Sequence, residues 1–272
     1  MVPSCNYKGP GWGAYLCHEG INCAETLRSA ASTTMGNVCT AFGYDQAPID
    51  DDDWDRRVVI APQGDHVATV IWLHGLGDTG QSWHRHVTTL GPLGGVKYIF
   101  PTAPTRRVTL NGGMQMPAWY DILGLRPQDR EDEVGIQRAA NMLAKLIQAE
   151  IARGVPPSKI AVVGFSQGAA VAMHTCYRLL TFPLACGVFL SGYLPMASSF
   201  HARSPNTPGL QCHGAKDTLV PLTFGKQSNE LLHAHGIACD FVAYPALGHT
   251  VDTAELNRVH AFVTTHLQIL SR

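Results

Sequence analysis

Residues 159–174 constrain the fold of this chain more than any other segment. An apolar run at 159–163 leads into the pentapeptide Gly-Phe-Ser-Gln-Gly at 164–168, and the residues after it are typical of a helix. A serine on a sharp turn between a strand and a helix is the arrangement called a nucleophile elbow. The glycines suit it, because a strained serine backbone needs small neighbours. We therefore expect Ser166 to project its hydroxyl from the carboxyl end of a strand.

The same pentapeptide also fits an ordinary glycine-rich turn after a buried strand, with Ser166 as the N-cap of the helix. That alternative requires no partner residues elsewhere in the chain. The two interpretations are separated by whether a base and an acid occur where a serine nucleophile would need them.

Apolar runs and segments of helical periodicity alternate from residue 57 onward. Strands are expected at 57–61, 67–73, 96–100, 159–163, 184–191, 210–212 and 238–244. Helices are expected at 79–90, 134–151, 169–174, 222–235 and 253–267. This alternation predicts an α/β fold, with a mostly parallel central sheet and helices on both faces. A ligand would then bind beyond the carboxyl ends of the strands.

The chain divides into two parts at about residue 55. Residues 1–55 lack periodicity, are rich in small and polar residues, and end in an acidic run at 50–53, which predicts a flexible N-terminal extension. Residues 56–272 form the predicted catalytic domain. Within it, residues 102–128 are rich in Pro and Gly and are expected to form one long loop, which in a compact domain is usually functional.

Composition and charge exclude several classes of protein. The formal net charge of −1 gives no electrostatic basis for binding nucleic acid. The first residues lack the apolar region of a secretory signal, and no stretch is apolar enough to span a membrane. The eight cysteines form no C-x-x-C pair, and those at 176, 186, 212 and 239 fall in predicted helices and strands. We therefore expect free thiols and a cytoplasmic protein.

Asp217 and His249 are the candidate partners of Ser166. In folds built around such an elbow, the acid and then the histidine follow the serine along the chain. Asp217 lies in the loop after the strand at 210–212, and His249 follows the strand at 238–244. Each alone is also explained as an ordinary loop residue. Because all three fall at the same edge of the sheet, the pattern favours a Ser-His-Asp triad.

Other histidines fit the role of base less well. His74 and His213 also end strands before a glycine, but both precede Asp217 and so lie on the wrong side of the acid. The pairs at 84 and 86 and at 233 and 235 are two residues apart on predicted helices, so they point to different faces. No third metal ligand is evident beside them. We therefore predict no metal and no cofactor.

An oxyanion hole needs two preorganised donors. The backbone amide of Gln167, directly after the nucleophile, is the first candidate. The second is expected in the glycine-bearing loop at 74–78, which follows an early strand, and the amide of Leu76 is the candidate there. A simple turn after a strand is the alternative explanation of that loop.

The chain resembles the acyl-protein thioesterase family, in the phospholipase/carboxylesterase branch of the α/β-hydrolases, from about residue 57 to the C-terminus. The shared segments are HGLGD at 74–78, PTAP at 101–104, VTLNGG at 108–113, MPAWYD at 116–121, the elbow, QCHG at 211–214 with Asp217 and VP at 220–221, and GH at 248–249. The resemblance implies an α/β-hydrolase fold with no large cap domain. It also implies a cytosolic serine hydrolase that removes fatty acyl groups, typically palmitate, from protein cysteines, with related activity on lysophospholipids and small esters.

The resemblance also assigns roles to individual residues. It implies Ser166, Asp217 and His249 as the triad and the amides of Leu76 and Gln167 as the oxyanion donors. It further implies an apolar acyl channel. The residues at the matching channel positions are Leu110, Met116, Trp119, Tyr193, Leu219 and Phe224, for each of which ordinary core packing is the alternative.

Three positions depart from the family pattern. Ala169 replaces a second glycine after the elbow, Tyr193 stands where the family often has Trp, and Arg107 replaces a proline beside Arg106. Two arginines near the acyl channel would favour anionic head groups or acidic peptide flanks. The chemistry is untouched by these changes, so a lysophospholipase or general carboxylesterase on the same site stays open as an alternative. A receptor without turnover is a further alternative, which the complete triad opposes.

The segment M-G-N-V-C-T at 35–40 matches the N-myristoylation pattern, with Cys39 as a second acylation site. The pattern acts only at a true N-terminus, so membrane association through an acylated N-terminus requires translation from Met35. Coincidence inside a longer leader is the alternative, and Cys5 is an alternative palmitoylation site. S-acylated proteins or lysolipids are the expected partners, as substrates.

Overall fold

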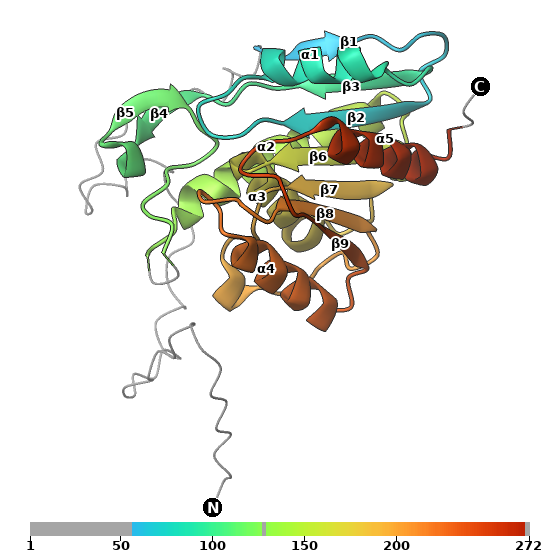
Figure 1. The fold of residues 1–272 in the computed structure, drawn as a ribbon. Coiled ribbons are helices and arrows are strands. Elements are labelled where there is room, and N and C mark those ends of the chain that lie inside the picture. Colours follow the sequence, from blue (N-terminus) through green and yellow to red (C-terminus); the bar gives the residue numbers. More distant parts are fainter. Residues whose placement is uncertain (1–55, 127–128, 270–272) are drawn as a thin grey trace, which may run out of the picture. The chain divides into compact units, whose positions relative to one another are not determined.

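The computed structural model describes residues 56–126 and 129–269. The predicted flexible extension at 1–55 lies outside the described residues. The described part is a seven-stranded sheet with helices on both faces, joined by a separate two-stranded hairpin (Figure 1). The strands are β1 Val58–Ile60, β2 Ala68–Leu73, β3 Val96–Phe100, β4 Thr105–Val108, β5 Met114–Pro117, β6 Ile160–Phe165, β7 Cys186–Leu190, β8 Gly209–Gly214 and β9 Cys239–Tyr244. The α-helices are α1 Gly80–Leu90, α2 Glu133–Ala152, α3 Gln167–Met173, α4 Leu222–Ala234 and α5 Thr253–Leu267.

The central sheet has the order β1-β3-β2-β6-β7-β8-β9. Only β1 is antiparallel to its neighbour among these strands, so the predicted α/β architecture is confirmed. The central strands are continuous apolar runs because both faces of a parallel sheet are covered by helices. The register pairs Leu73 at the end of β2 with Gly164 near the end of β6, which brings the loop at 74–78 beside the elbow.

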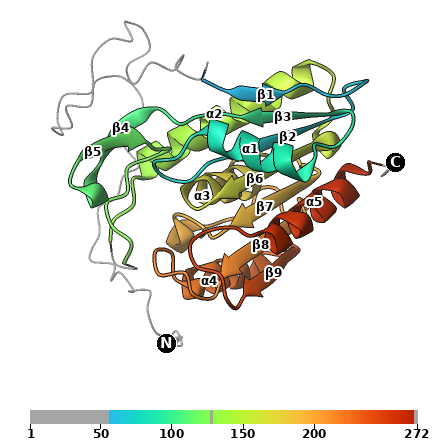
Figure 2. The same ribbon diagram turned by 45° about the horizontal axis from the view of Figure 1, so that its top comes forward.

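Alternate side chains of each strand enter one of two apolar cores. Ile71 and Leu73 of β2 belong to the core that α2, α3 and α4 cover. Val70 and Trp72 belong to the opposite core, which α1 and α5 cover (Figure 2). The period-two alternation of a strand therefore supplies both layers from one short segment.

The prediction of one long loop at 102–128 was incomplete. The structure forms the hairpin of β4 and β5 there, with a single 3₁₀ turn at Thr109–Asn111 between the strands. Gly112 and Gly113 have φ of 64° and 78°, so they supply the left-handed turn that closes the hairpin. The helix after the elbow also continues beyond its predicted end at His174, as a π-helical segment at His174–Leu179.

The four described cysteines are free and buried, as the sequence predicts. Burial raises the pKa of Cys176, Cys212 and Cys239 to about 12. These thiols are therefore protonated at neutral pH and act as small apolar side chains.

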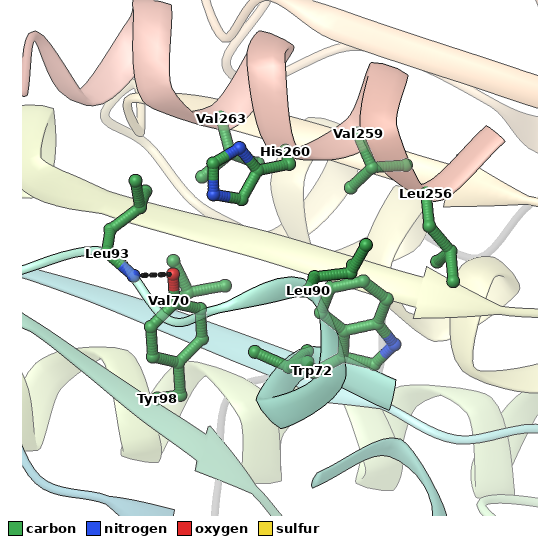
Figure 3. Close-up of a pocket in the computed structure, with 10 residues that line it drawn as sticks. Val70, Trp72, Leu90, Leu93, Tyr98, Leu256, Val259, His260 and Val263 are labelled. Carbon is green, nitrogen blue, oxygen red and sulfur yellow. Dashed lines mark hydrogen bonds between the residues drawn. The ribbon is translucent and has the colours of Figure 1, made fainter. Parts of the chain in front are cut away.

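A small apolar cavity of about 20 Å³ remains in the core between the sheet, α1 and α5 (Figure 3). Val70 and Trp72 of β2, Tyr98 of β3, and Val259 and Val263 of α5 line it. Nearly all of the surface that it exposes is apolar, although His260 of α5 and Tyr98 of β3 are among its lining residues. The described part of the chain therefore contains a site of imperfect packing against β2.

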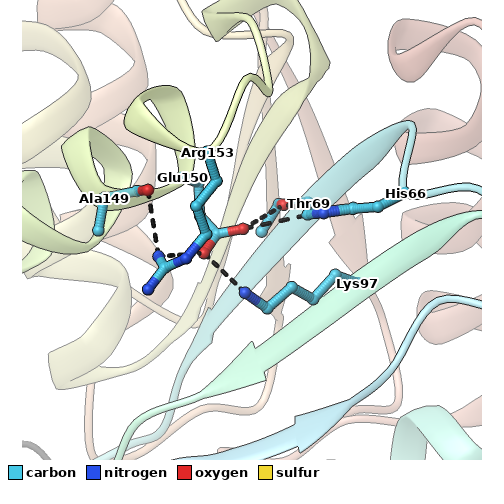
Figure 4. Close-up of polar contacts among 6 residues, drawn as sticks. All are labelled: His66, Thr69, Lys97, Ala149, Glu150 and Arg153. Carbon is cyan, nitrogen blue, oxygen red and sulfur yellow. Dashed lines mark hydrogen bonds and ion pairs between the residues drawn. The ribbon is translucent and has the colours of Figure 1, made fainter.

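A buried carboxylate anchors the C-terminal end of α2 to the amino-terminal ends of β2 and β3 (Figure 4). Glu150 is 1% exposed and accepts hydrogen bonds from Lys97 Nζ at 2.7 Å and Thr69 Oγ1 at 2.9 Å. Arg153 Nη1 donates a further bond at 3.0 Å. Burial alone raises the pKa of Glu150, but the hydrogen bonds and charges of Lys97, Thr69 and Arg153 outweigh it and lower the pKa.

We expect Glu150→Gln to destabilise the fold at pH 7 by about 1–3 kcal/mol, since half-buried Lys97 and exposed Arg153 lose their buried charged acceptor. A lowered pKa means that the carboxylate contributes stability above its unfolded pKa and that this contribution is lost as the pH falls through the folded pKa. The difference between variant and wild type should therefore shrink in acid. Urea unfolding at pH 7 and about pH 4 measures it, with the exposed Glu230→Gln as the control. An equal loss at both pH values would contradict the expectation.

Candidate active site

Ser166 lies at the apex of the turn between β6 and α3. Its backbone has φ 52° and ψ −117°, a conformation that costs a non-glycine residue free energy and is found at functional sites. Its N–H donates to the carbonyl of Leu190 on β7 at 2.8 Å, which holds the turn against the sheet. Gly164 and Gly168 approach neighbouring backbone too closely for any Cβ. The elbow and its need for glycine, predicted from the pentapeptide, are therefore present.

The three predicted triad residues meet at the carboxyl edge of the sheet. His249 Nε2 lies 2.9 Å from Ser166 Oγ, and His249 Nδ1 lies 2.7 Å from Asp217 Oδ2. Because the Asp217 carboxylate only accepts, Nδ1 carries the proton and donates to it. The bare Nε2 is then free to accept the serine proton. The arrangement has the geometry of a nucleophile, a base and an orienting acid.

The Asp217 carboxylate is held rigidly by its own loop. Its Oδ1 accepts the N–H of Leu219 at 3.0 Å and the N–H of Val220 at 2.9 Å. His213 Nε2 lies 2.8 Å from the Val220 carbonyl and 3.5 Å from Asp217 Oδ2. Burial lowers the pKa of His213, which is fully buried. The histidine that contacts Ser166 is His249 and not His213. The contact of His213 with the Val220 carbonyl stabilises the loop that carries Asp217.

The two candidate oxyanion donors follow the paired strands β2 and β6, Leu76 in the loop after β2 and Gln167 at the start of α3. Gly75 touches the nucleophile, since a Cβ on it would lie 3.4 Å from Ser166 Cβ. The N–H of Leu76 follows directly, and the N–H of Gln167 is the first of α3. Within residues 56–126 and 129–269 neither amide donates a hydrogen bond. Both are therefore available to a negative oxygen beside Ser166.

The six predicted channel residues lie in different surroundings. Leu110 and Leu219 are 43% and 59% exposed, and Met116 lies beside Gly77, whose Cβ position is 3.5 Å from its sulfur. Tyr193 and Phe224 are half-buried and pack edge to face with ring centroids 6.4 Å apart. The Tyr193 hydroxyl lies 2.9 Å from that of Tyr120.

Trp119 is the exception among the six, because it is 1% exposed and belongs to the core. Its indole Nε1–H donates to the His74 carbonyl at 2.8 Å. Its own backbone N–H donates to the Gln167 side chain at 2.8 Å. These contacts of Trp119, and the role of the Gln167 side chain in binding it, were not predicted from the sequence. The only available signal was that His74, Trp119 and Gln167 all lie in family motifs.

Both Arg106 and Arg107 are expected from the sequence to favour anionic groups of the substrate, and this expectation is wrong for Arg106. In β4 the side chains alternate, so Arg106 and Val108 point into the protein whereas Arg107 is exposed. Arg106 is 7% exposed, and burial lowers its pKa. A substrate charge can therefore meet Arg107 but not Arg106.

The described residues contain no group of three or more His, Cys, Asp or Glu side chains placed to hold a metal ion. None of the helices that the structure describes is both long and apolar enough to cross a bilayer.

The chain matches the family model described as Phospholipase/Carboxylesterase over residues 55–267. It is a member of that family. Acyl-protein thioesterase 1 of Schizosaccharomyces pombe is 39% identical over 217 residues, which cover 77% of this chain and 96% of the relative. Acyl-protein thioesterase 1 homolog 1 of Dictyostelium discoideum is 37% identical, over 74% of this chain and 92% of its own.

Solved structures agree with this family assignment. The crystal structure of Zea mays acyl-protein thioesterase 2 is 34% identical and covers 78% of this chain and 99% of its own, with a TM-score of 0.68. The resemblance inferred from the motifs is thereby confirmed, as are the α/β-hydrolase fold and the assignment to the hydrolases.

We expect Asp217→Asn to lower kcat by roughly 10⁴, because an amide no longer selects the imidazole tautomer with a bare Nε2. KM should change little, since Asp217 contacts His249 and its own loop rather than the substrate. Steady-state kinetics on an acyl thioester measures both constants. Asp240→Asn, an exposed carboxylate on β9, is the control. Activity of Asp217→Asn within tenfold of wild type would exclude the triad.

Proposed function

We propose that this protein is an acyl-protein thioesterase that removes fatty acyl groups, typically palmitate, from protein cysteines. The observation that carries the proposal is the relay from Ser166 through His249 to Asp217. The two relatives at 37% and 39% identity are both named acyl-protein thioesterases, which supports the substrate class.

Acylation of the enzyme is the first step. His249 Nε2 accepts the proton of Ser166 as Oγ attacks the thioester carbonyl, and Asp217 stabilises the imidazolium that forms. The amides of Leu76 and Gln167 stabilise the oxyanion of the tetrahedral intermediate. The C–S bond then breaks, and His249 returns its proton to the leaving thiolate, which departs as the protein's cysteine thiol.

Deacylation repeats the same steps with water. His249 removes a proton from water as its oxygen attacks the acyl-serine ester, and the same two amides hold the second oxyanion. The Ser166 alkoxide leaves with the proton from His249, which restores the free enzyme and releases the fatty acid.

A lysophospholipase or general carboxylesterase is the second candidate function, since an ester reacts by the same steps. The exposed apolar Leu110 and Leu219 and the half-buried Met116, Tyr193 and Phe224 are the proposed contacts of the acyl chain. Exposed Arg107 is the proposed contact for an anionic head group or an acidic peptide flank. We place the enzyme in the cytoplasm, with no nucleic-acid partner.

We expect Ser166→Ala to abolish hydrolysis of an S-palmitoyl peptide without loss of the fold. Wild type should show its highest kcat/KM on long-chain acyl thioesters when an acyl series is compared with a lysolipid and a short ester. Ser198→Ala, an exposed serine, is the matched control.

Substantial turnover by Ser166→Ala would contradict the nucleophile. A lysolipid or short ester preferred over every thioester would replace the thioesterase by the second candidate. A wild-type protein that neither turns over nor reacts with an active-site serine probe would indicate a receptor.

A lipid-anchored form is a separate proposal, on residues that lie outside the described part of the chain. Translation from Met35 would place Gly36 at the N-terminus for myristoylation, with Cys39 available for a second acyl chain. Two chains anchor a protein stably whereas one binds marginally.

We expect the intact mass of the native protein to correspond to a chain beginning at Gly36 with one or two acyl groups. Gly36→Ala in the Met35-initiated chain should release it from the membrane fraction. A lipid-free native chain that begins at Met1 would refute the proposal.

A further inference from the structure

We infer that a buried chain of hydrogen bonds through Gln167, Trp119 and His74 sets the positions of the two oxyanion donors relative to each other. Trp119 and His74 are positioning residues in this chain. The inference rests on the proposed function, because it assigns these residues to the oxyanion hole of that mechanism.

The first link is the side chain of Gln167, whose backbone N–H is one of the two donors. Its Oε1 accepts the N–H of Trp119 at 2.8 Å, and its Nε2 donates to the carbonyl of Tyr120 at 2.8 Å. Gln167 is 2% exposed. One residue of the elbow thus clamps two consecutive backbone positions of the segment after β5.

The second link is the indole of Trp119. Its Nε1–H donates to the carbonyl of His74 at 2.8 Å, and the two rings lie with centroids 4.9 Å apart. Both residues are fully or almost fully buried. The segment that Gln167 clamps is therefore bound directly to the end of β2.

The third link is the imidazole of His74. Its Nε2 lies 2.9 Å from the backbone N of Ala103, which only donates, so Nε2 accepts and Nδ1 carries the ring proton. Nδ1 then donates to the carbonyl of Gly75 at 2.6 Å. Burial lowers the pKa of His74, which favours the neutral ring that this pattern requires.

The Gly75 carbonyl is the point where the chain reaches the second donor. This carbonyl and the N–H of Leu76 belong to one peptide group, which is planar and trans. In a trans peptide the C=O and N–H point in opposite directions. A bond that directs the Gly75 carbonyl toward His74 therefore directs the Leu76 N–H away from His74, and it cannot rotate while that bond holds.

The indole bond of Trp119 is not a general property of buried tryptophans in this protein. Trp72 and Trp83 are also buried, and their Nε1 atoms find no hydrogen-bond partner in the part of the chain that the structure describes. The partnered indole is the one that lies between the two donor loops. Preorganised donors stabilise a developing oxyanion because they need no rearrangement in the transition state.

Trp119→Phe is the central test, since it keeps a buried aromatic ring but removes the five-membered ring that carries the indole N–H. We expect kcat to fall about tenfold with KM unchanged, less than the roughly 10²-fold or greater loss when a donor is deleted. An alkyl trifluoromethyl ketone, which forms a tetrahedral oxyanion on a serine, should bind weaker by the same factor as kcat/KM falls. A non-hydrolysable thioether analogue of the substrate should bind unchanged. Trp72→Phe, which loses an unpartnered N–H, should match wild type in all three.

His74 provides an independent pair of variants. Asn can place an amide donor near the position of Nδ1, whereas Leu cannot donate at all. We expect His74→Asn to retain more kcat than His74→Leu, with the ketone affinity in the same order. Thermal melting of every variant identifies any that fails to fold.

Any of three outcomes overturns the inference. The first is a kcat of folded Trp119→Phe within twofold of wild type. The second is a fall in thioether affinity, or in the kcat of Trp72→Phe, as large as the fall in the kcat of Trp119→Phe, and the third is equal kcat for folded His74→Asn and His74→Leu. Turnover by Ser166→Ala would instead refute the proposed function, so the two failures are distinguishable.

Discussion

The site depends on the close contact between the elbow and the end of β2. A Cβ on Gly168 would lie 2.5 Å from the carbonyl oxygen of Leu73 and 2.6 Å from that of His74. Glycine is the residue that allows these two backbones to meet, and the contact sets the nucleophile and the loop at 74–78 side by side. The strained turn at Ser166 persists because the strands on both sides of β6 hold it within the sheet.

The strands, the helices and the triad are predictable from the sequence because their signals are short apolar runs and single residues that follow these runs directly. Continuous apolar strands such as β6 and β7 are recognisable because a parallel sheet buries both faces. Asp217 and His249 follow strands that must end at one edge, so their convergence with Ser166 requires only the strand order of the chain. Thirty-two residues separate Asp217 from His249 and 83 separate His249 from Ser166, yet the topology alone joins them.

The side-chain contacts were less accessible to prediction because they depend on where a side chain points. The sequence predicts Arg106 as a charge near the substrate, but it lies in an unpredicted hairpin whose alternating side chains point it into the protein. The sequence predicts Trp119 as an apolar residue of the acyl channel, but its indole N–H donates to the carbonyl of His74, 45 residues away, and so joins two segments of the chain. Hairpin pairing between β4 and β5 and the path of the segment after β5 decide both, and neither leaves a periodic pattern in the sequence.

The apolar cavity beside β2 gives the face of the sheet under α1 and α5 a site that responds to hydrostatic pressure. Unfolding eliminates internal voids, so pressure shifts the equilibrium away from a state that contains them. The void is on the face covered by α1 and α5, whereas Gln167 and Trp119 lie in or against the core on the other face. Pressure therefore favours loosening of the packing between α1, α5 and β2. This cavity and the hydrogen-bonded residues Gln167 and Trp119 lie on opposite faces of β2.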